Sequence, residues 1–156
     1  MRALLLSAGF GTRLKPYTLK TPKCLIKING KPLLEYWLRF LFNSGIEEVI
    51  INTHYYPEQV NQFIRNSKYK KKITLVFEKE LLGTAGTIIN NRSFFKKKDF
   101  IVAHSDNLCI CSFKDFIKSH LNKPKECLMT MMTFKTTDPS SCGIVKLNNK
   151  NVVNNF

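Results

Sequence analysis

Hydrophobic residues occur in short blocks along the chain, and two kinds of spacing alternate from block to block. Residues 2–7 (RALLLS) form a continuous apolar run, which is typical of a strand buried on both faces of a sheet. Residues 32–45 instead place large apolar side chains three and four positions apart, as one face of a helix requires. The pattern therefore predicts a buried strand followed by an amphipathic helix.

The same alternation continues through most of the sequence. Further strands are predicted at 47–53, 73–78, 99–107, 127–135 and as a hairpin within 143–156, and further helices at 57–66, within 79–91 and at 112–121. Strands that alternate with helices predict an α/β fold, a three-layer sandwich with a mostly parallel central sheet. Because composition does not change along the chain, we expect one domain over 1–156.

Composition excludes several classes of protein. The five cysteines are odd in number and irregularly spaced, so reduced thiols are expected rather than disulfides or a zinc site. No stretch approaches 18 consecutive apolar residues, which argues against a membrane span. We therefore expect a cytoplasmic protein without a membrane partner, and the sequence leaves a homo-oligomer open.

The net charge of +14, from 25 basic and 11 acidic residues, raises the question of nucleic-acid binding. The excess is mostly lysine and lies in separate runs such as 68–72 and 94–99, which is typical of solvated faces. The sequence has no zinc-finger spacing and no RNP-like aromatic strand. We expect no nucleic-acid partner, because a small anionic substrate benefits from the same field.

A glycine-rich segment follows the first predicted strand. Gly9 and Gly11 allow close approach of the backbone to a ligand, while Arg13 and Lys23 supply positive charge suited to phosphate. A dinucleotide fingerprint needs a third glycine where Leu14 stands, and the Gly-Lys-Ser/Thr of a Walker A loop is absent. A turn that only connects two elements would not need Arg13 or Lys23. The segment is therefore interpreted as a phosphate cradle of another kind.

The stretch LLLSAGFGTRLKPYTLKTPKCLIKINGKPLLEY resembles the opening signature of the sugar-1-phosphate nucleotidylyltransferases, or NDP-sugar pyrophosphorylases. In that family a Gly-x-Gly-Thr-Arg loop precedes Pro-Lys and then Gly-x-Pro-(Leu/Met)-(Leu/Ile). The segments EEVIINTHYYPEQV, ELLGTAGTI and FIVAHSDN also follow in family order, so the resemblance covers essentially the whole chain. It implies the family's Rossmann-like nucleotide-binding fold.

The resemblance implies that a nucleoside triphosphate reacts with a sugar 1-phosphate to form an NDP-sugar and pyrophosphate. Arg13 would bind the leaving pyrophosphate, Lys23 would lie against the α-phosphate and the sugar phosphate, and Asp106 would hold Mg²⁺. The LGTAG segment looks most like the guanylyltransferase branch that acts on mannose or heptose 1-phosphates. Uridylyl-, thymidylyl- and cytidylyltransferases share the rest of the signature and stay open.

Other residues would form the nucleotide pocket by the same resemblance. The backbone of Gly9, Gly11 and Thr12 would hold the triphosphate. The base would be framed by Leu6, Ala8, Glu80, Gly83 and Thr84. Taken alone, Thr84 could instead be the N-cap of an ordinary helix, and the residues around Asp106 could form an ordinary turn.

The sequence departs from the family pattern in one respect. Family members continue with a Glu-Lys-Pro element that grips the sugar phosphate and with a second aspartate at the metal, and neither occurs here. We therefore expect that the C-terminal part of the family domain is lacking and that the chain is a fragment. A non-catalytic nucleotide- or sugar-binding module is the alternative from another functional class.

Overall fold

The computed structural model describes residues 1–155. The chain divides into two compact units, Met1–Cys111 and Ser112–Phe156, of which Phe156 lies outside the described range. Both units are covered by the predicted domain 1–156, and that assignment stays a prediction.

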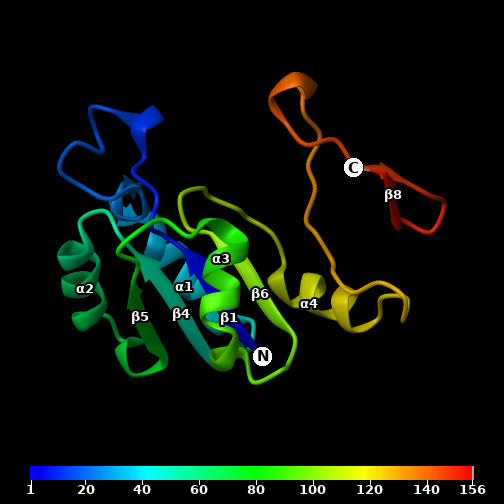
Figure 1. The fold of residues 1–156 in the computed structure, drawn as a ribbon, viewed down its shortest axis with the longest axis horizontal. Helices are drawn as coiled ribbons and strands as arrows, with labels where there is room; N and C mark the ends of the chain where they lie inside the picture. The colour runs from blue at the N-terminus through cyan, green and yellow to red at the C-terminus, as the bar shows by residue number, and fades with distance from the viewer. Residues whose placement is uncertain (156) are drawn as a thin grey trace. The chain divides into compact units, whose positions relative to one another are not determined.

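A four-stranded parallel sheet forms the centre of the first unit (Figure 1). Its strands are β1 (Arg2–Leu6), β4 (Glu48–Thr53), β5 (Ile73–Phe77) and β6 (Phe100–His104), in the order β5-β4-β1-β6. The four strands predicted in this part of the sequence are confirmed. All four run parallel, so the loops that follow them emerge at the same edge of the sheet.

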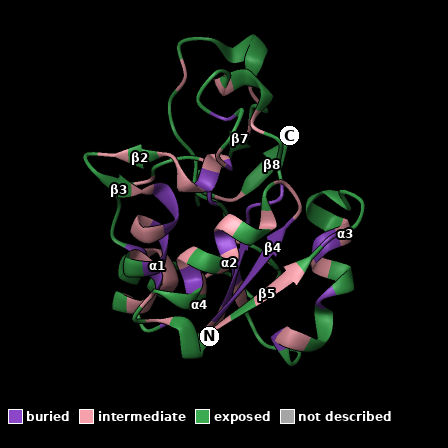
Figure 2. Ribbon diagram, turned by 90° about the vertical axis from the view of Figure 1, so that its left-hand side faces the viewer, coloured by how far each residue is buried: buried purple, intermediate pink, exposed green. Residues whose placement is uncertain are grey.

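Helices cover both faces of this sheet. They are α1 (Leu33–Asn43), α2 (Pro57–Arg65) and α3 (Gly83–Asn90), as the helical spacing predicted. Figures 1 and 2 show α1 and α3 on opposite sides of the strands. Leu4 and Leu6 pack with Phe95 on the α3 side, while the neighbouring Leu5 points to the other face. The three-layer arrangement follows from this alternation.

Burial is deepest in β1, β4 and one face of α1, and Figure 2 shows most of β4 in purple. Leu4 and Leu5 are both fully buried, which confirms the prediction of a strand covered on both faces. Truncating either side chain to alanine would cost about 2–5 kcal/mol, since a filled interior cannot close the space left behind. The first unit thus contains a hydrophobic core, as the chain length and the pattern of apolar residues predict.

The segment between β1 and α1 contains only short elements. They are the 3₁₀ turns η1 (Thr12–Leu14) and η2 (Lys23–Leu25) and a small hairpin of β2 (Lys27–Ile28) with β3 (Lys31–Pro32). Further 3₁₀ turns, η3 (Lys70–Lys72) and η4 (Arg92–Phe95), precede β5 and β6. The long loop after β1 therefore depends on tertiary contacts for its shape.

The second unit contains α4 (Phe113–Leu121), the 3₁₀ turn η5 (Pro139–Ser141) and an antiparallel hairpin of β7 (Lys146–Leu147) with β8 (Val153–Asn155). The predicted helix and hairpin are confirmed within the described residues. Ser112 caps α4 by accepting a hydrogen bond from the backbone N–H of Asp115 at 3.3 Å.

The strand predicted at 127–135 is wrong, because the structure has no strand in this range. The segment CLMTMMTFK has the composition of a strand. A strand also needs a neighbour for its backbone hydrogen bonds, and the described residues provide none for this segment. Leu128 and Phe134 are accordingly 91% and 81% exposed.

The longest described helix, α1, has 11 residues. Within residues 1–155 no helix combines the length and the apolarity that crossing a bilayer requires.

Candidate active site

The loops that follow β1, β5 and β6 line one cavity of about 200 Å³ in the first unit. Of the residues predicted for the site, the lining includes Leu6, Ala8, Gly9, Gly11, Lys23, Gly83, Thr84 and Asp106. These residues come from segments up to 100 positions apart in sequence, and the parallel strands bring them to one edge.

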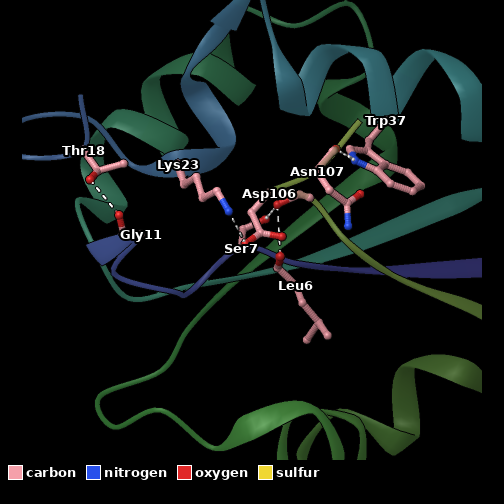
Figure 3. Close-up of polar contacts among 9 residues, drawn as sticks. Leu6, Ser7, Gly11, Thr18, Lys23, Trp37, Asp106 and Asn107 are labelled. Atoms are coloured by element: carbon pink, nitrogen blue, oxygen red, sulfur yellow. Dashed lines mark hydrogen bonds and ion pairs between the residues drawn. The ribbon is translucent and has the colours of Figure 1, made fainter. Parts of the chain in front are cut away.

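Lys23 and Asp106 form an ion pair inside this cavity, with 2.9 Å between Nζ and Oδ2 (Figure 3). The side chains are 26% and 41% exposed, so the pair is partly solvated. Such pairs stabilise a fold by only about 0–1 kcal/mol. Their main consequence is chemical: an ammonium and a carboxylate stand together on the wall of a cavity, ready to exchange partners with an incoming phosphate or cation.

The backbone beside Asp106 is tied to the end of β1. Ser105 donates from its hydroxyl to the carbonyl of Leu6 at 3.0 Å, and its N–H donates to the same carbonyl at 3.1 Å. The Ser7 and Ser105 hydroxyls lie 2.7 Å apart. Because the Ser105 proton is already used, Ser7 is the donor to Ser105. Asp106 is thus fixed relative to the first strand.

A second tie holds the other side of Asp106. The indole Nε1 of Trp37, on α1, donates to the backbone carbonyl of Asn107 at 2.9 Å (Figure 3). Trp37 is 5% exposed, so this bond is anchored in the core. The acidic turn is therefore held from both neighbours and is more constrained than a free surface turn.

The two glycines of the loop differ in their surroundings. Gly11 has φ +64°, and a Cβ there would lie 2.9 Å from Cγ2 of Thr18 and 3.2 Å from Cβ of Lys23. Gly9 has no atom within 4 Å of an added Cβ, although it lines the cavity. Gly11 is thus required by the protein itself, whereas the space beside Gly9 is left open.

Thr12 and Arg13 lie on η1 and are exposed, outside the lining of the cavity. Within the described part of the chain, Arg13 forms no ion pair with a carboxylate. Their roles in binding the triphosphate and pyrophosphate stay predictions. So does that of Glu80, which is also exposed and does not line the cavity.

Glu78 lines the cavity and was missed by sequence reasoning, which selected Glu80 in its place. It is only 4% exposed. Its Oε1 accepts hydrogen bonds from Asn52 Nδ2 at 3.0 Å and from Thr87 Oγ1 at 2.5 Å. The signal available in the sequence was its place as the last residue of a predicted strand.

Asn52 fixes the orientation of this carboxylate. Its Oδ1 accepts from the backbone N–H of Ser7 at 2.7 Å, so its amide nitrogen must face Glu78. The backbone N–H of Leu82 lies 3.4 Å from the other carboxylate oxygen, Oε2. The cavity thus has a rigid wall that can accept further hydrogen bonds at Oε2.

The beginning of α3 forms another part of the wall. Gly83 has φ +68° and is the first residue of the helix, and the N-cap position is Leu82 without a side-chain hydrogen bond. The alternative that Thr84 is the N-cap is therefore wrong, because Thr84 already lies inside the first turn. The positive end of the helix dipole at Gly83 and Thr84 adds positive potential to the cavity.

Cys24 also lines the cavity, and it is not a nucleophile at neutral pH. Burial raises the pKa of its thiol to about 12. Its side chain is held in the neutral form and contributes shape rather than charge.

The cavity wall contains Asp106 as a candidate ligand for a metal ion. Within residues 1–155 no cluster of three His, Cys, Asp or Glu side chains could form a complete metal site. Asp106 is one carboxylate on the cavity wall with Oδ2 toward Lys23. A single carboxylate fits Mg²⁺, which keeps waters and takes its other ligands from substrate phosphates.

Comparisons with known proteins show which family the chain belongs to. A family model described as nucleotidyl transferase matches residues 2–156. The chain is 35% identical over 159 residues to the mannose-1-phosphate guanylyltransferase catalytic subunit beta of Drosophila melanogaster. It is 34% identical over 154 residues to the mannose-1-phosphate guanyltransferase of Saccharomyces cerevisiae. These matches cover 99% and 93% of this chain but only 42% and 41% of the relatives.

Solved structures show the same fold. HddC from Yersinia pseudotuberculosis complexed with GMP-PN matches with a TM-score of 0.67 and 31% identity, over 78% of this chain and 54% of that one. The CTP:phosphocholine cytidylyltransferase LicC of Streptococcus pneumoniae matches with a TM-score of 0.59 and 31% identity, over 71% and 47%. The predicted α/β sandwich of the Rossmann-like type is confirmed. On the sequence match and the shared fold, the chain belongs to the nucleotidyl transferase family.

Proposed function

We propose that the protein forms an NDP-sugar and pyrophosphate from a nucleoside triphosphate and a sugar 1-phosphate, with GTP and mannose- or heptose-1-phosphate as substrates. The observation that carries this proposal is the Lys23–Asp106 pair in a cavity bounded by Gly9 and Gly11. The guanylyltransferase relatives support it, although the chain spans about two fifths of their length.

The reaction needs little covalent chemistry from the protein. A phosphate oxygen of the sugar 1-phosphate attacks the α-phosphorus of the triphosphate, and the bond from that phosphorus to the oxygen bridging to the β-phosphate breaks. Pyrophosphate leaves with the bonding electrons. Two anions must be held in line and the charge on the transferred phosphate stabilised, which is what fixed cations and backbone N–H groups provide.

Lys23 is suited to the centre of this reaction. Its ammonium group is a compact point charge on the cavity wall, held near Asp106 before substrate binds. A phosphate oxygen can replace the carboxylate as its partner. Lys23 would then bind both the α-phosphate and the sugar phosphate, and stabilise charge on them in the transition state.

Asp106 would hold Mg²⁺ through its carboxylate once Lys23 turns to phosphate. The metal, when bound, would neutralise negative charge on the phosphate oxygens. Arg13 lies exposed on η1, and its planar guanidinium suits the leaving pyrophosphate. Thr12 and the backbone of Gly9 and Gly11 would complete the triphosphate site.

Glu78 supports guanine as the base. Its Oε1 already accepts from Asn52 and Thr87, so Oε2 is the oxygen left for a base. Guanine presents two neighbouring donors, N1–H and N2–H₂, from which Oε2 can accept. Uracil and thymine place carbonyl oxygens on both sides of a single N–H, and cytosine has one donor group, so these bases would meet the carboxylate less well. Leu6 and Ala8 would frame the base. Glu80, which the resemblance implies at the base, is the alternative to Glu78.

The location and partners belong to the same proposal. We expect a cytoplasmic enzyme, where nucleoside triphosphates and sugar phosphates are available. Neither nucleic acid nor a membrane is a proposed partner, and a homo-oligomer stays open.

The test combines binding and turnover. Thermal unfolding is followed with Mg²⁺ and each of GTP, UTP, dTTP, CTP and ATP, since a ligand at 100 times its Kd stabilises by about 2.7 kcal/mol. GTP is expected to raise the Tm most. Pyrophosphate release is then measured with mannose 1-phosphate. Binding without release would favour the non-catalytic module, and no stabilisation by any nucleotide would overturn the proposal.

A further inference from the structure

Three adjacent backbone carbonyls of the loop after β1 accept hydrogen bonds from side chains that follow β4. Tyr55 Oη donates to Thr18 O at 3.0 Å, Tyr56 Oη to Leu19 O at 2.7 Å, and Gln59 Nε2 to Lys20 O at 2.8 Å. We call Tyr55, Tyr56 and Gln59 the clasp. Loops after β1 and β4 meet because these strands are parallel neighbours, with Leu6 paired to Asn52.

The clasp is linked directly to Gly11. Thr18, whose carbonyl accepts from Tyr55, donates from Oγ1 to the carbonyl of Gly11 at 2.8 Å. Thr18 is 1% exposed although most of its loop neighbours are exposed. Only one residue therefore separates the Tyr55 hydroxyl from the glycine whose conformation shapes the cavity wall.

A ring contact holds the other arm of the loop. Phe10, between the two glycines, packs edge-on against His54 with centroids 5.1 Å apart and against Tyr55 at 5.6 Å. His54 is itself fixed, because its Nδ1 lies 2.8 Å from the carbonyl of Glu78 and its ring stacks on Phe77. The loop is thus held at Phe10 and at 18–20 by one short segment.

We propose that the clasp positions the glycine loop for the triphosphate and thereby sets the affinity for the β- and γ-phosphates; this rests on the proposed function. Tyr55, Tyr56 and Gln59 lie outside the lining of the cavity. They are positioning residues and not catalytic ones. Between β1 and η2 the loop has no regular structure other than η1, so its geometry there depends on such contacts.

The experiment uses the double variant Tyr55→Phe/Tyr56→Phe, which removes two hydroxyls and keeps both rings. Tyr17→Phe is the matched control, because Tyr17 lies in the same loop and is 71% exposed. Dissociation constants are measured for GTP and GMP with Mg²⁺. Losing two hydrogen bonds that order the loop is expected to weaken GTP binding about tenfold. GMP binding and the Tyr17→Phe variant should be unchanged.

A second measurement needs no ligand. Hydrogen exchange of peptides covering 8–21 is expected to speed up in the double variant, while peptides from α1 keep their protection. Gln59→Glu replaces the donor by an acceptor without a change in volume. It is the variant to use if the double variant folds poorly, and it is also expected to weaken GTP binding.

The outcomes separate the two proposals. If the unmodified chain binds neither GTP nor GMP, the proposed function fails and the clasp proposal falls with it. If it binds GTP and the variants bind equally well, only the clasp is wrong. An equal loss of GTP and GMP affinity with a lowered Tm would show a general structural role, and would also overturn the clasp proposal.

Discussion

The two edges of the parallel sheet in the first unit both carry positively charged side chains, but their surroundings differ. At the carboxyl edge, Lys23 lines a cavity and pairs with Asp106. At the amino edge, η3 (Lys70–Lys72) precedes β5 and residues 96–98, also three lysines, precede β6. A cavity and an ion-pair partner, and not the number of lysines, therefore distinguish the carboxyl edge as the candidate site.

The cations of the amino edge are used in another way. Lys72 lies with Nζ 5.8 Å from the ring centroid of Phe42, and Arg2, whose side chain is 16% exposed, pairs with Glu48. Residues 70–72 and 96–98 are exposed, and none lines the cavity. Long cationic side chains that cover apolar surface while their charges stay in water are typical of a solvated face.

The largest effect is expected from Lys23→Ala. Removing a charge that stabilises the transition state should lower the rate of pyrophosphate release by about 10²–10³-fold, or roughly 3 kcal/mol. Lys71→Ala, at the amino edge, is the matched control and should leave the rate unchanged. If a folded Lys23→Ala variant released pyrophosphate at a near-normal rate, the carboxyl edge would be no more important for the reaction than the amino edge.

The two glycines offer the next test. Gly11→Ala should destabilise the fold by about 1–2 kcal/mol for the left-handed backbone alone, with crowding against Thr18 in addition. Gly9→Ala should leave stability unchanged and weaken GTP binding, because its methyl group enters open space at the cavity. Urea unfolding and GTP titration measure both. Equal stability of the two variants would contradict the geometry of the loop.

A smaller change is expected from Glu78→Gln. An amide presents a donor as well as an acceptor, so the preference for GTP over UTP should narrow by about tenfold. Glu80→Gln is the control, since Glu80 is exposed outside the cavity. Dissociation constants for GTP and UTP are measured for both variants. If the preference for GTP over UTP changed only in Glu80→Gln, Glu80 and not Glu78 would contact the base, as the sequence analysis expected.

The smallest effect is expected from replacing Lys70, Lys71 and Lys72 together by glutamine. At about 0.15 M salt the Debye length is about 8 Å, so charges at the far edge of the sheet are screened from the cavity. GTP affinity should therefore stay the same at this ionic strength. Isothermal titration checks it, and a clear loss of affinity would mean that the amino edge also takes part in binding.

Periodicity predicted the four sheet strands and the helices around them, because buried faces impose spacings that can be read locally. The strand at 127–135 was predicted wrongly, because only local information was used there as well. Its composition is that of a strand, but pairing depends on a neighbour that composition cannot supply. The hairpin within 143–156 was predicted correctly, because its two arms are close in sequence and form their own pair.

Candidate site residues divide in a similar way. The sequence by itself determined that a strand would lead into a glycine loop with Lys23 nearby and that Asp106 would follow a later strand. Only the tertiary structure brought Lys23 to within 2.9 Å of Asp106 and selected Glu78, rather than Glu80, for the cavity wall. Local spacing reports which face of an element is buried. Which side chains meet across 83 residues depends on strand order and register, which the packing of the whole sheet decides.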